Sequence, residues 1–593
     1  MSPCPDPRHI SNGYVIPSEC YADQPYVVRT DDGAWLCVLT TSSGREGQHG
    51  QHVVTARSTD QGRTWSPLVD VEPADGPEAS YAVLLKGTDG RVFCFYNHNS
   101  DDRRWVIADD PPYPGGRCER VDSQGYFVWK ASHDHGRTWA ASRTPIPIRE
   151  FAIDRENAYG GKVQFFWNVG RAFHHEGVAY VSLHKVGGFG EGFFTRSEGV
   201  LLASDNLLTE ADPARVRWET LPEGDRGLAA PVGLGPIAEE QSFSVLSDGS
   251  FFCVYRTISG YSVCCYSRDK GRSWSPPRMM RYANGRPIKH PRAANFCWAC
   301  GEGRYLYWYH NHGGTWYEDR NPVWLSGGVE IDGAEEREIA WSQPEIALYD
   351  DDPYVRLSYP DLIIQDGRYD VTETQKDVAR VHALDGAMLE ALWGQHERRT
   401  RTDEGLLLDA SEQALAGDEP VLMPELPAFT MRDGGRADYG TKELRAGFTI
   451  EMWVRFDALV PGGILLNTRA DDGQGMLLEV MPEGALRFTL NDGRTENAWA
   501  SDPNRLTAGQ LHHVAIVVDA GPKIMLFIID GVLCDGGEGR QFGWGRFSPH
   551  LRHANGADEA CVGPFDGEVI SLRIYGRALW TSEVVGNNGA GAD

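Results

Sequence analysis

Hydrophobic and polar positions alternate with a period of two at residues 448–456 (FTIEMWVRF), which is typical of a half-buried β-strand. Strand-like hydrophobic runs follow at residues 511–519, 524–531 and 567–575. Earlier in the chain, polar clusters interrupt short apolar runs, and no run approaches the ~18 apolar residues of a membrane-spanning helix. The pattern predicts a β-rich protein without a transmembrane helix.

An eight-residue pattern recurs three times in the first two thirds of the chain. It reads STDQGRTW at residues 58–65, SHDHGRTW at 132–139 and SRDKGRSW at 267–274. In such a turn the Asp accepts backbone hydrogen bonds, the Gly takes a positive φ, a hydroxyl closes the turn, and the Trp packs between sheets. Each copy therefore predicts a turn at the outer rim of a β-sheet.

Two degenerate copies, which end at Trp218 and Trp341, extend the repeat. The five tryptophans lie 56 to 79 residues apart, which suits one four-stranded sheet with an inserted loop in each repeat. A sixth unit at about residues 358–393 is completed by the N-terminal strand, so that the ring closes without exposed sheet edges. The repeat predicts a six-bladed β-propeller.

The octapeptide is the Asp-box, or BNR repeat, and residues 1–393 resemble the six-bladed sialidase (neuraminidase) superfamily. Residues 394–440 begin with a charged stretch and read as a linker. Residues 441–593 resemble a laminin-G/concanavalin-like jelly roll, a module that either binds glycans or serves as a structural wedge. The predicted fold class is all-β: a six-bladed β-propeller followed by a jelly-roll β-sandwich.

Composition and charge limit the classes of molecule that such a protein can bind. The 593 residues carry 57 Lys and Arg against 84 Asp and Glu, a net charge of −27, so no basic field attracts nucleic acid or an anionic membrane. We expect an oligo- or polysaccharide partner, and the oligomeric state stays open. Because the N-terminus lacks a basic stretch before an apolar core, we expect a cytoplasmic protein, or a secreted or periplasmic one whose leader has been removed.

The twelve cysteines are too few for a disulfide scaffold in a chain of this length. The lone Cys297-x-x-Cys300 pair favours buried strand thiols over a zinc knuckle. Cys534 and Cys561 could pair, but spacing alone does not decide it. We predict no cofactor and no catalytic metal, and leave a structural calcium open.

Three equally spaced residues resemble a substrate-binding segment of the fourth sialidase blade. Glu240 and Arg256 lie eight residues before and after Asp248, which begins an Asp-Gly turn. The resemblance implies that Glu240 polarises the nucleophile and that Arg256 helps to clamp a substrate carboxylate, which a guanidinium binds bidentately. Arg320 fits the position of a further clamping arginine.

The segment that begins Ser358-Tyr359-Pro, with Glu373 downstream, resembles the one that carries the family's nucleophilic tyrosine. The resemblance implies that Tyr359 attacks the anomeric carbon. A neutral phenol suits a substrate with a carboxylate there because it avoids charge repulsion, and a neighbouring glutamate can take its proton.

Two positions depart from the family pattern. Asp23 stands where the family has its first clamping arginine, and the loop at residues 44–52, whose arginine is Arg45, lacks the aspartate that acts as general acid. Glu46, His49 or His52 would then protonate the leaving group, and we favour His49. The incomplete clamp favours a sugar other than ordinary sialic acid, such as a uronic acid or a neutral deoxy sugar.

Asp23 and Glu373 are expected to be neighbours, because in the family a glutamate at the position of Glu373 pairs with the arginine that Asp23 replaces. Two carboxylates with no cation between them would raise the pKa of one of them, or would bind sugar hydroxyls, an amine or a metal. A protonated Asp23 could itself supply the missing acid.

Further polar clusters are expected to lie at the same end of the propeller axis as Tyr359. The substrate-binding candidates in them are His184, Arg292 and His310. His310 and His312 lie two residues apart and would point the same way on a strand, so a metal pair stays an alternative.

Together these residues favour a sialidase-like exo-glycoside hydrolase that releases a terminal sugar with retention, by means of a tyrosine nucleophile. Two alternatives remain. Tyr359, His184 and Arg256 could serve a polysaccharide lyase that acts on a uronate-containing glycan, or the propeller could bind glycans without catalysis.

Overall fold

The computed structural model describes residues 6–109, 116–123, 125–190, 193–333, 337–411, 415, 420–435 and 440–592. The chain divides into two compact units. The propeller unit comprises Ile10–Trp341 and Ile346–Gly386, and the C-terminal unit comprises Met1–His9, Ser342–Glu345 and Ala387–Asp593.

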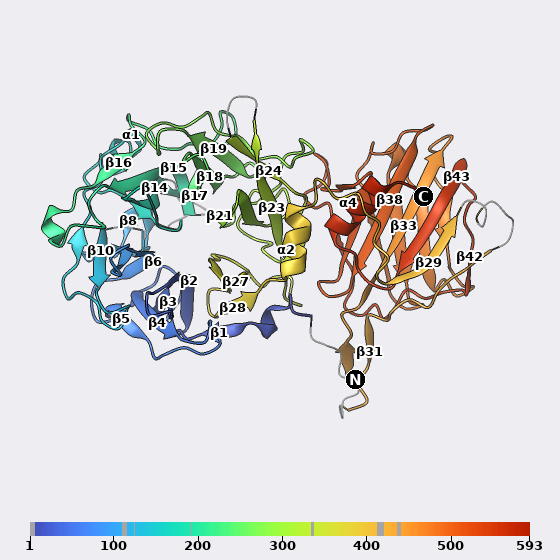
Figure 1. The fold of residues 1–593 in the computed structure, drawn as a ribbon, viewed down its shortest axis with the longest axis horizontal. Coiled ribbons are helices and arrows are strands. Elements are labelled where there is room, and N and C mark those ends of the chain that lie inside the picture. Colours follow the sequence, from blue (N-terminus) through green and yellow to red (C-terminus); the bar gives the residue numbers. More distant parts are fainter. Residues whose placement is uncertain are drawn as a thin grey trace. The chain divides into compact units, whose positions relative to one another are not determined.

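Six antiparallel sheets, the blades, surround a common centre in the propeller unit (Figure 1). Blade 1 consists of β2 (Tyr21–Arg29), β3 (Trp35–Ser42), β4 (His52–Ser58) and β5 (Val69–Glu72). Blade 2 consists of β6 (Ala79–Lys86), β7 (Val92–His98), β10 (Tyr126–Ser132) and β11 (Thr144–Pro145). Blade 3 consists of β12 (Phe166–Trp167), β13 (Phe173–His175), β14 (Val178–Gly190), β15 (Phe193–Ser204) and β16 (Glu219–Leu221).

The other three blades complete the ring. Blade 4 consists of β17 (Glu239–Val245), β18 (Phe251–Arg256), β19 (Val263–Ser267) and β20 (Arg278–Met279). Blade 5 consists of β21 (Phe296–Gly301), β22 (Arg304–Tyr309), β23 (Val323–Asp332), β24 (Arg337–Trp341) and β25 (Glu345–Leu348). Blade 6 consists of β26 (Leu362–Gln365), β27 (Arg368–Thr374), β28 (Ala379–Ala383) and β1 (Tyr14–Ile16). A small ribbon of β8 (Val106–Ile107) and β9 (Arg117–Cys118) lies between β7 and β10 in the sequence.

The N-terminal strand β1 closes the ring, as predicted. It pairs antiparallel with β28, with Val15 opposite Arg380. The last blade therefore combines strands from the two ends of the propeller sequence, and this pairing covers an edge that would otherwise be exposed. The predicted all-β fold class, a six-bladed β-propeller followed by a jelly-roll β-sandwich, is confirmed.

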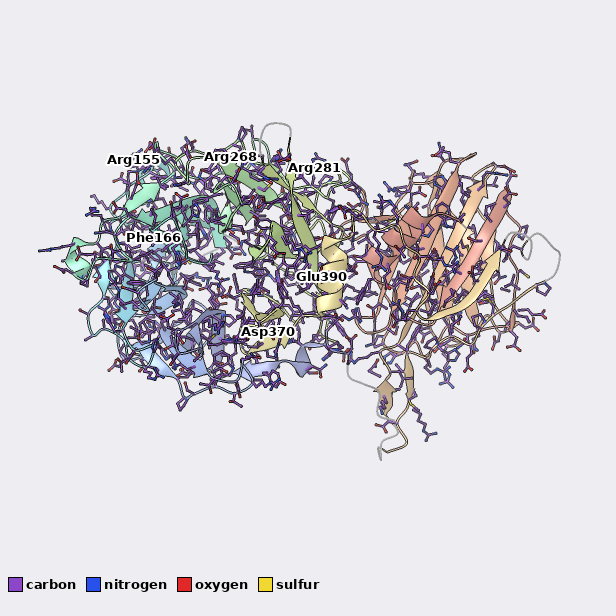
Figure 2. The ribbon with its side chains drawn as sticks, in the orientation of Figure 1. Arg155, Phe166, Arg268, Arg281, Asp370 and Glu390 are labelled. Atoms are coloured by element: carbon purple, nitrogen blue, oxygen red, sulfur yellow. The ribbon has the colours of Figure 1, made fainter. Side chains whose placement is uncertain are left out.

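The innermost strands begin at one end of the propeller axis, the front end, and finish at the other, the rear end. Strands β2, β6, β17 and β21 pack against one another around the centre and are mostly buried. Because each blade is antiparallel, the connection from its second to its third strand returns to the front end. Residues from the starts of the inner strands and from these connections therefore meet at the front. Figure 2 draws the side chains over the ring, with Phe166 of blade 3 and Asp370 of blade 6 labelled.

The three repeated turns have the hydrogen bonds expected of them. In the first, the Thr64 amide donates to Asp60 Oδ1 over 2.9 Å, and the Gly62 amide donates to Ser58 Oγ over 2.8 Å. Gly62 has a φ of 81°. The same bonds recur around Asp134 and Asp269. Local side-chain bonds thus hold each turn outside the ring.

The C-terminal unit is a β-sandwich with its own apolar core. The larger sheet contains β29 (Leu406–Ser411), β43 (Gly567–Tyr575), β33 (Gly447–Phe456), β38 (Leu511–Asp519), β39 (Ile524–Ile529), β40 (Val532–Leu533) and β41 (Gly545–Arg546). The second sheet contains β34 (Ile464–Asn467), β35 (Gly475–Val480), β36 (Leu486–Asn491) and β37 (Glu496–Ala500). Two short ribbons join β30 (Val421–Leu422) to β42 (Glu559–Ala560), and β31 (Thr430–Arg432) to β32 (Thr441–Glu443).

The predicted linker at residues 394–440 is wrong. Strand β29 lies inside it and pairs with β43 of the larger sheet, with Ala410 opposite Leu572. The charged residues around β29 resembled a linker because that strand lies at the sheet edge, where only some side chains are buried.

The α-helices in the described residues are short: α1 (Ala152–Arg155), α2 (Gly386–Trp393) and α4 (Thr581–Ala590). Within the described ranges, no helix combines the length and apolar character needed to cross a membrane. Cys297, Cys300, Cys534 and Cys561 are free thiols, so the pairing left open for the last two does not form here.

Candidate active site

Bulges at the starts of the inner strands turn polar side chains toward the front end. The register of blade 4 shifts between Glu239 and Ser242, and Glu240 takes a φ of 58°. Blade 1 shifts in the same place after Asp23, where Gln24 has a φ of 54°. In a regular strand two consecutive side chains point to opposite faces, whereas a bulge with a left-handed residue re-aims them. Glu239 and Glu240 can therefore both serve one site.

Tyr359, Glu240 and Arg256 form the centre of this site. The Tyr359 hydroxyl donates to Glu240 Oε1 over 3.0 Å, and Arg256 Nη1 lies 2.9 Å from the same oxygen. All three side chains are buried, with exposed fractions of 5% or less. Burial raises the pKa of Glu240 above its ordinary value, although Arg256 and Arg320 oppose the rise. The carboxylate is thus a stronger base than an ordinary glutamate, and it accepts a bond from the phenol.

Glu239 holds two arginines in place. Its Oε2 lies 2.9 Å from Arg256 Nε, and its Oε1 lies 2.6 Å from Arg292 Nη2. Against the effect of burial, Arg292 and Arg256 lower the pKa of Glu239 to about 2. Glu239 is therefore ionised, and it fixes the orientation of Arg256 toward Glu240.

Arg320 approaches Tyr359 from blade 5. It lies in the connection between β22 and β23, and its Nη1 donates to Ser358 Oγ over 2.8 Å. Burial and the Glu240 carboxylate raise the pKa of Tyr359 to about 12, while Lys376, Arg256 and Arg320 act in the opposite direction. The nucleophile candidate is thus surrounded by three cations and one carboxylate.

Lys376 supplies a cation that the sequence analysis missed. It lies in the turn between β27 and β28, with Nζ 2.8 Å from Asp23 Oδ2 and 3.3 Å from Glu46 Oε2. The same Nζ lies 4.2 Å from the centre of the Tyr359 ring. Burial raises the pKa of Asp23 and Lys376 opposes the rise. Against burial, Lys376 and Arg120 lower the pKa of Glu46 to about 2.

The expected pair of Asp23 and Glu373 with no cation between them is therefore wrong. Glu373 Oε1 lies 3.1 Å from His382 Nε2, and its Oε2 accepts a hydrogen bond from Gln375. Asp23 instead has Lys376 as its cation and accepts a 2.7 Å hydrogen bond from the Tyr21 hydroxyl. Lys376 reaches Asp23 because the β27–β28 turn returns to the front end beside the start of β2, where the Ala22 amide donates to the Lys376 carbonyl.

Two residues of the 44–52 loop that were candidates lie elsewhere. The side chain of His49 is 72% exposed, and its Nδ1 lies 2.7 Å from Arg104 Nη1 and 3.3 Å from Glu78 Oε1. Arg45 is also exposed, and within the described residues its side chain forms no ion pair with the cluster around Tyr359. Glu46 is the residue of this loop that the structure brings to Lys376 and Arg120.

His184 and His310 border the site from blades 3 and 5. The Glu240 amide donates to His184 Nδ1 over 3.2 Å, which leaves the ring proton on Nε2. Burial lowers the pKa of His184 to about 3, so the ring is neutral. His184 Nε2, His310 Nε2 and Glu240 Oε2 are buried and have no hydrogen-bond partner among the described residues.

The metal pair considered for His310 and His312 does not assemble. His310 Nδ1 lies 3.3 Å from the Pro322 carbonyl, and His312 Nε2 lies 2.9 Å from the Asp319 carbonyl. Across the ranges that the structure describes, no group of three or more His, Cys, Asp or Glu side chains is placed to hold a metal ion.

The residues missed by the sequence analysis share a position in the fold. Lys376, Arg120 and Glu46 all lie between the second and third strands of their blades, as Arg320 does. Connections between the second and third strands of a blade lie at the front end, so the order of the strands in the sequence already indicates that Lys376 lies there. No comparable signal marked Glu239, because only the bulge turns it to the same site as Glu240.

A family profile matches part of the C-terminal unit. Residues 434–585 match the profile of the concanavalin A-like lectin/glucanases superfamily. No curated protein matches the chain. A protein of unknown function from Dyadobacter fermentans is 15% identical, with a TM-score of 0.45, over 63% of this chain and 97% of its own.

Sialidases are among the solved structures that resemble the chain. The intramolecular trans-sialidase of Ruminococcus gnavus is 15% identical, with a TM-score of 0.44, over 63% of this chain and 97% of its own. The sialidase of Trypanosoma rangeli is 12% identical, with a TM-score of 0.42, over 98% of this chain and 95% of its own. At these identities and TM-scores, the chemistry of this chain has to be argued from its own residues. Within the C-terminal unit, residues 434–585 are thus similar to the concanavalin A-like lectin/glucanases superfamily.

Proposed function

We propose that this protein is a glycoside hydrolase that removes a terminal sugar from an oligo- or polysaccharide with Tyr359 as the nucleophile. The observation that carries the proposal is the contact of the Tyr359 hydroxyl with Glu240, whose carboxylate also binds Arg256. A tyrosine that serves only to fill the core needs no buried base and no ring of cations around it.

In the proposed reaction, Glu240 takes the phenolic proton while the Tyr359 oxygen attacks the anomeric carbon. The bond from that carbon to the departing sugar breaks, and the departing oxygen receives a proton from an acid in the site. The conjugate base of that acid then takes a proton from water, whose oxygen attacks the anomeric carbon of the glycosyl-tyrosine. The bond from that carbon to the Tyr359 oxygen breaks, Glu240 returns its proton to this oxygen, and the sugar is released with retention at the anomeric centre. The raised pKa of Glu240, which follows from its burial, supports its role as the base.

An acidic sugar is the substrate that the charges favour. Arg256 and Arg320 are buried beside the nucleophile, and Lys376 lies over its ring. These three cations can hold a substrate carboxylate and stabilise the phenolate that forms and departs. Since Lys376 is shared with two carboxylates, this wall differs from an arginine clamp, and we do not expect ordinary sialic acid as the preferred substrate.

Asp23 is the proposed proton donor. Its pKa is raised by burial, whereas the pKa of Glu46 is lowered to about 2, and His49 points to the surface beside Arg104. The Asp23→Asn variant should lose turnover with substrates that have a poor leaving group. It should retain more with an activated aryl glycoside, which needs little protonation. Near-normal turnover with both substrates would rule out this role.

The nucleophile is tested by screening aryl glycosides and uronate polysaccharides with the wild type and Tyr359→Phe. We expect Tyr359→Phe to lower kcat by about a thousandfold or more while the protein stays folded. A fluorinated substrate analogue should label the peptide that contains Tyr359. A new ultraviolet-absorbing double bond in the product would indicate elimination instead. Equal glycan binding by both proteins, with turnover by neither, would identify a glycan-binding propeller.

A further inference from the structure

A second cavity lies at the rear end of the propeller axis. Its volume is about 390 Å³, and it is lined by the last residues of β2, β6 and β17, by residues 297–299 of β21 and by residues 171–174. Arg29 ends β2 and Lys86 ends β6, while Trp298 lies in β21. Five of the six blades therefore contribute to one depression around the axis.

This cavity is separate from the Tyr359 site. Asp23 belongs to the front-end cluster and Arg29 lines the rear cavity, yet both lie on β2. Six residues of extended strand, at ~3.3 Å each, separate the two ends by about 20 Å. A ligand in the rear cavity would therefore not contact Tyr359, and its binding is independent of the function proposed above.

The charged groups that line the cavity are cations. Arg29, Lys86 and Arg171 line it, and the lining residues, all of them in the described ranges, include no Asp or Glu. Lys86 pairs with Asp31, and Arg171 Nη1 lies 3.6 Å from Asp361. Arg29 is exposed and forms no ion pair within the described part of the chain. In a protein with a net charge of −27, such a lining favours an anion.

Trp298 adds an aromatic side chain to the same wall. Its side chain is 5% exposed, and its Nε1–H has no acceptor among the described residues. A buried indole N–H without a partner costs free energy. Phe173 and Phe243 also line the cavity and present apolar rings. The lining thus combines cations and aromatic faces.

We propose that the rear cavity binds a small anionic sugar, with its carboxylate or phosphate at Arg29 and its ring against the aromatic side chains. Arg29 has no competing carboxylate within the part of the chain that the structure describes. Lys86 and Arg171 raise the local potential although each already has an acidic neighbour. A sugar ring presents both an apolar face and several acceptors, which matches this lining.

Calorimetric titration of the full chain with D-glucuronate, D-glucose 6-phosphate and D-glucose tests the proposal. We expect at least one of the two anions to bind and neutral glucose to bind more weakly. Arg29→Ala should weaken the anion about tenfold or more, because it removes a charge-assisted hydrogen bond.

Two controls separate this cavity from other anion sites. Arg256→Ala alters the front-end site and should leave the rear binding unchanged. Arg215→Ala removes an arginine whose side chain is 75% exposed, and it should also have no effect. Binding of neither anion at about 10 mM overturns the proposal. So does an unchanged affinity in Arg29→Ala, or an affinity lost in Arg256→Ala instead.

Discussion

Replacing Lys376 by Met tests the charge arrangement of the front end without requiring a known substrate. The ammonium lies between Asp23 and Glu46, and its side chain is only 18% exposed. Met has a similar length and no charge, so the variant removes the cation and largely keeps the volume. The buried carboxylate of Asp23 and the half-buried carboxylate of Glu46 would then face each other, and Arg120 would remain as the nearby cation of Glu46.

The expected cost follows from the ion pairs of this lysine. Removing one partner of a buried ion pair costs about 3–5 kcal/mol. A second estimate comes from Glu46, whose pKa is about 2 instead of the ordinary 4.5. Lys376 and Arg120 lower it against the opposing effect of burial. At about 1.4 kcal/mol per pKa unit this shift corresponds to about 3 kcal/mol, shared between the two cations. We expect Lys376→Met to destabilise the propeller by about 3 kcal/mol at pH 8.

The pH dependence of this loss has a definite sign. In the wild type the lowered pKa of Glu46 contributes stability that is complete above pH 4.5 and is lost as the pH falls toward 2. Without Lys376 the pKa of Glu46 rises, and the pKa of Asp23, already raised by burial, rises further. Both groups then take up protons more readily as the pH falls from 8 toward 5. The destabilisation should therefore be smaller at pH 5 than at pH 8.

The stability is measured by urea unfolding of the full chain at both pH values. Hydrogen exchange in peptides that cover β2 and β27 reports on the propeller separately from the C-terminal unit. Asp23→Asn in the Lys376→Met background should recover part of the loss, since an amide needs no counterion. Lys270→Met, which breaks an exposed pair with Glu176, should cost less than about 1 kcal/mol. Wild-type stability of Lys376→Met at pH 8, or a greater loss at pH 5, would refute the reasoning.

Three further outcomes are expected. Burial raises the pKa of Glu345, which accepts a hydrogen bond from the start of α4, to about 7. The protonated carboxyl therefore contributes stability that is complete below pH 4.5 and is lost as the pH rises through 7. Glu345→Gln should flatten the dependence of C-terminal unfolding on pH between 4.5 and 7. Asp134→Ala should cost about 1–2 kcal/mol in the blade 2 turn, measured by hydrogen exchange, because two bonds to Thr138 are lost. With a substrate in hand, kcat/KM should fall as the pH drops through the raised pKa of Glu240, and Glu240→Gln should abolish this limb and lower kcat by about 10²–10⁴.

The sequence determined the propeller because the features that specify it are local. Asp60 and its hydrogen-bond partners lie within one turn, and the Trp spacing repeats along the chain, so neither depends on distant residues. The period-two pattern of residues 448–456 indicated a strand of the C-terminal unit for the same reason. The edge strand β29 was missed, since its charged surroundings outweighed its short hydrophobic run.

The residues of the front end were only partly predictable. Tyr359, Glu240, Arg256 and Arg320 came from a resemblance, and the structure brings these four together. The expectations for His49 and for the Asp23–Glu373 pair came from the same reasoning, and the structure places those side chains elsewhere. The residues next to His49 or Asp23 in the sequence do not indicate which distant side chain each of them contacts.

Only the tertiary structure decided which charges share the site. Lys376 and Asp23 are separated by 353 positions in the chain, and they meet because blade 6 closes the ring beside blade 1. Glu239 and Glu240 face one site because a bulge breaks the alternation that their order alone implies. Strand patterns and turns follow from short-range hydrogen bonding and burial, whereas the pairing of charges follows from ring closure and bulge position, which depend on contacts between distant segments.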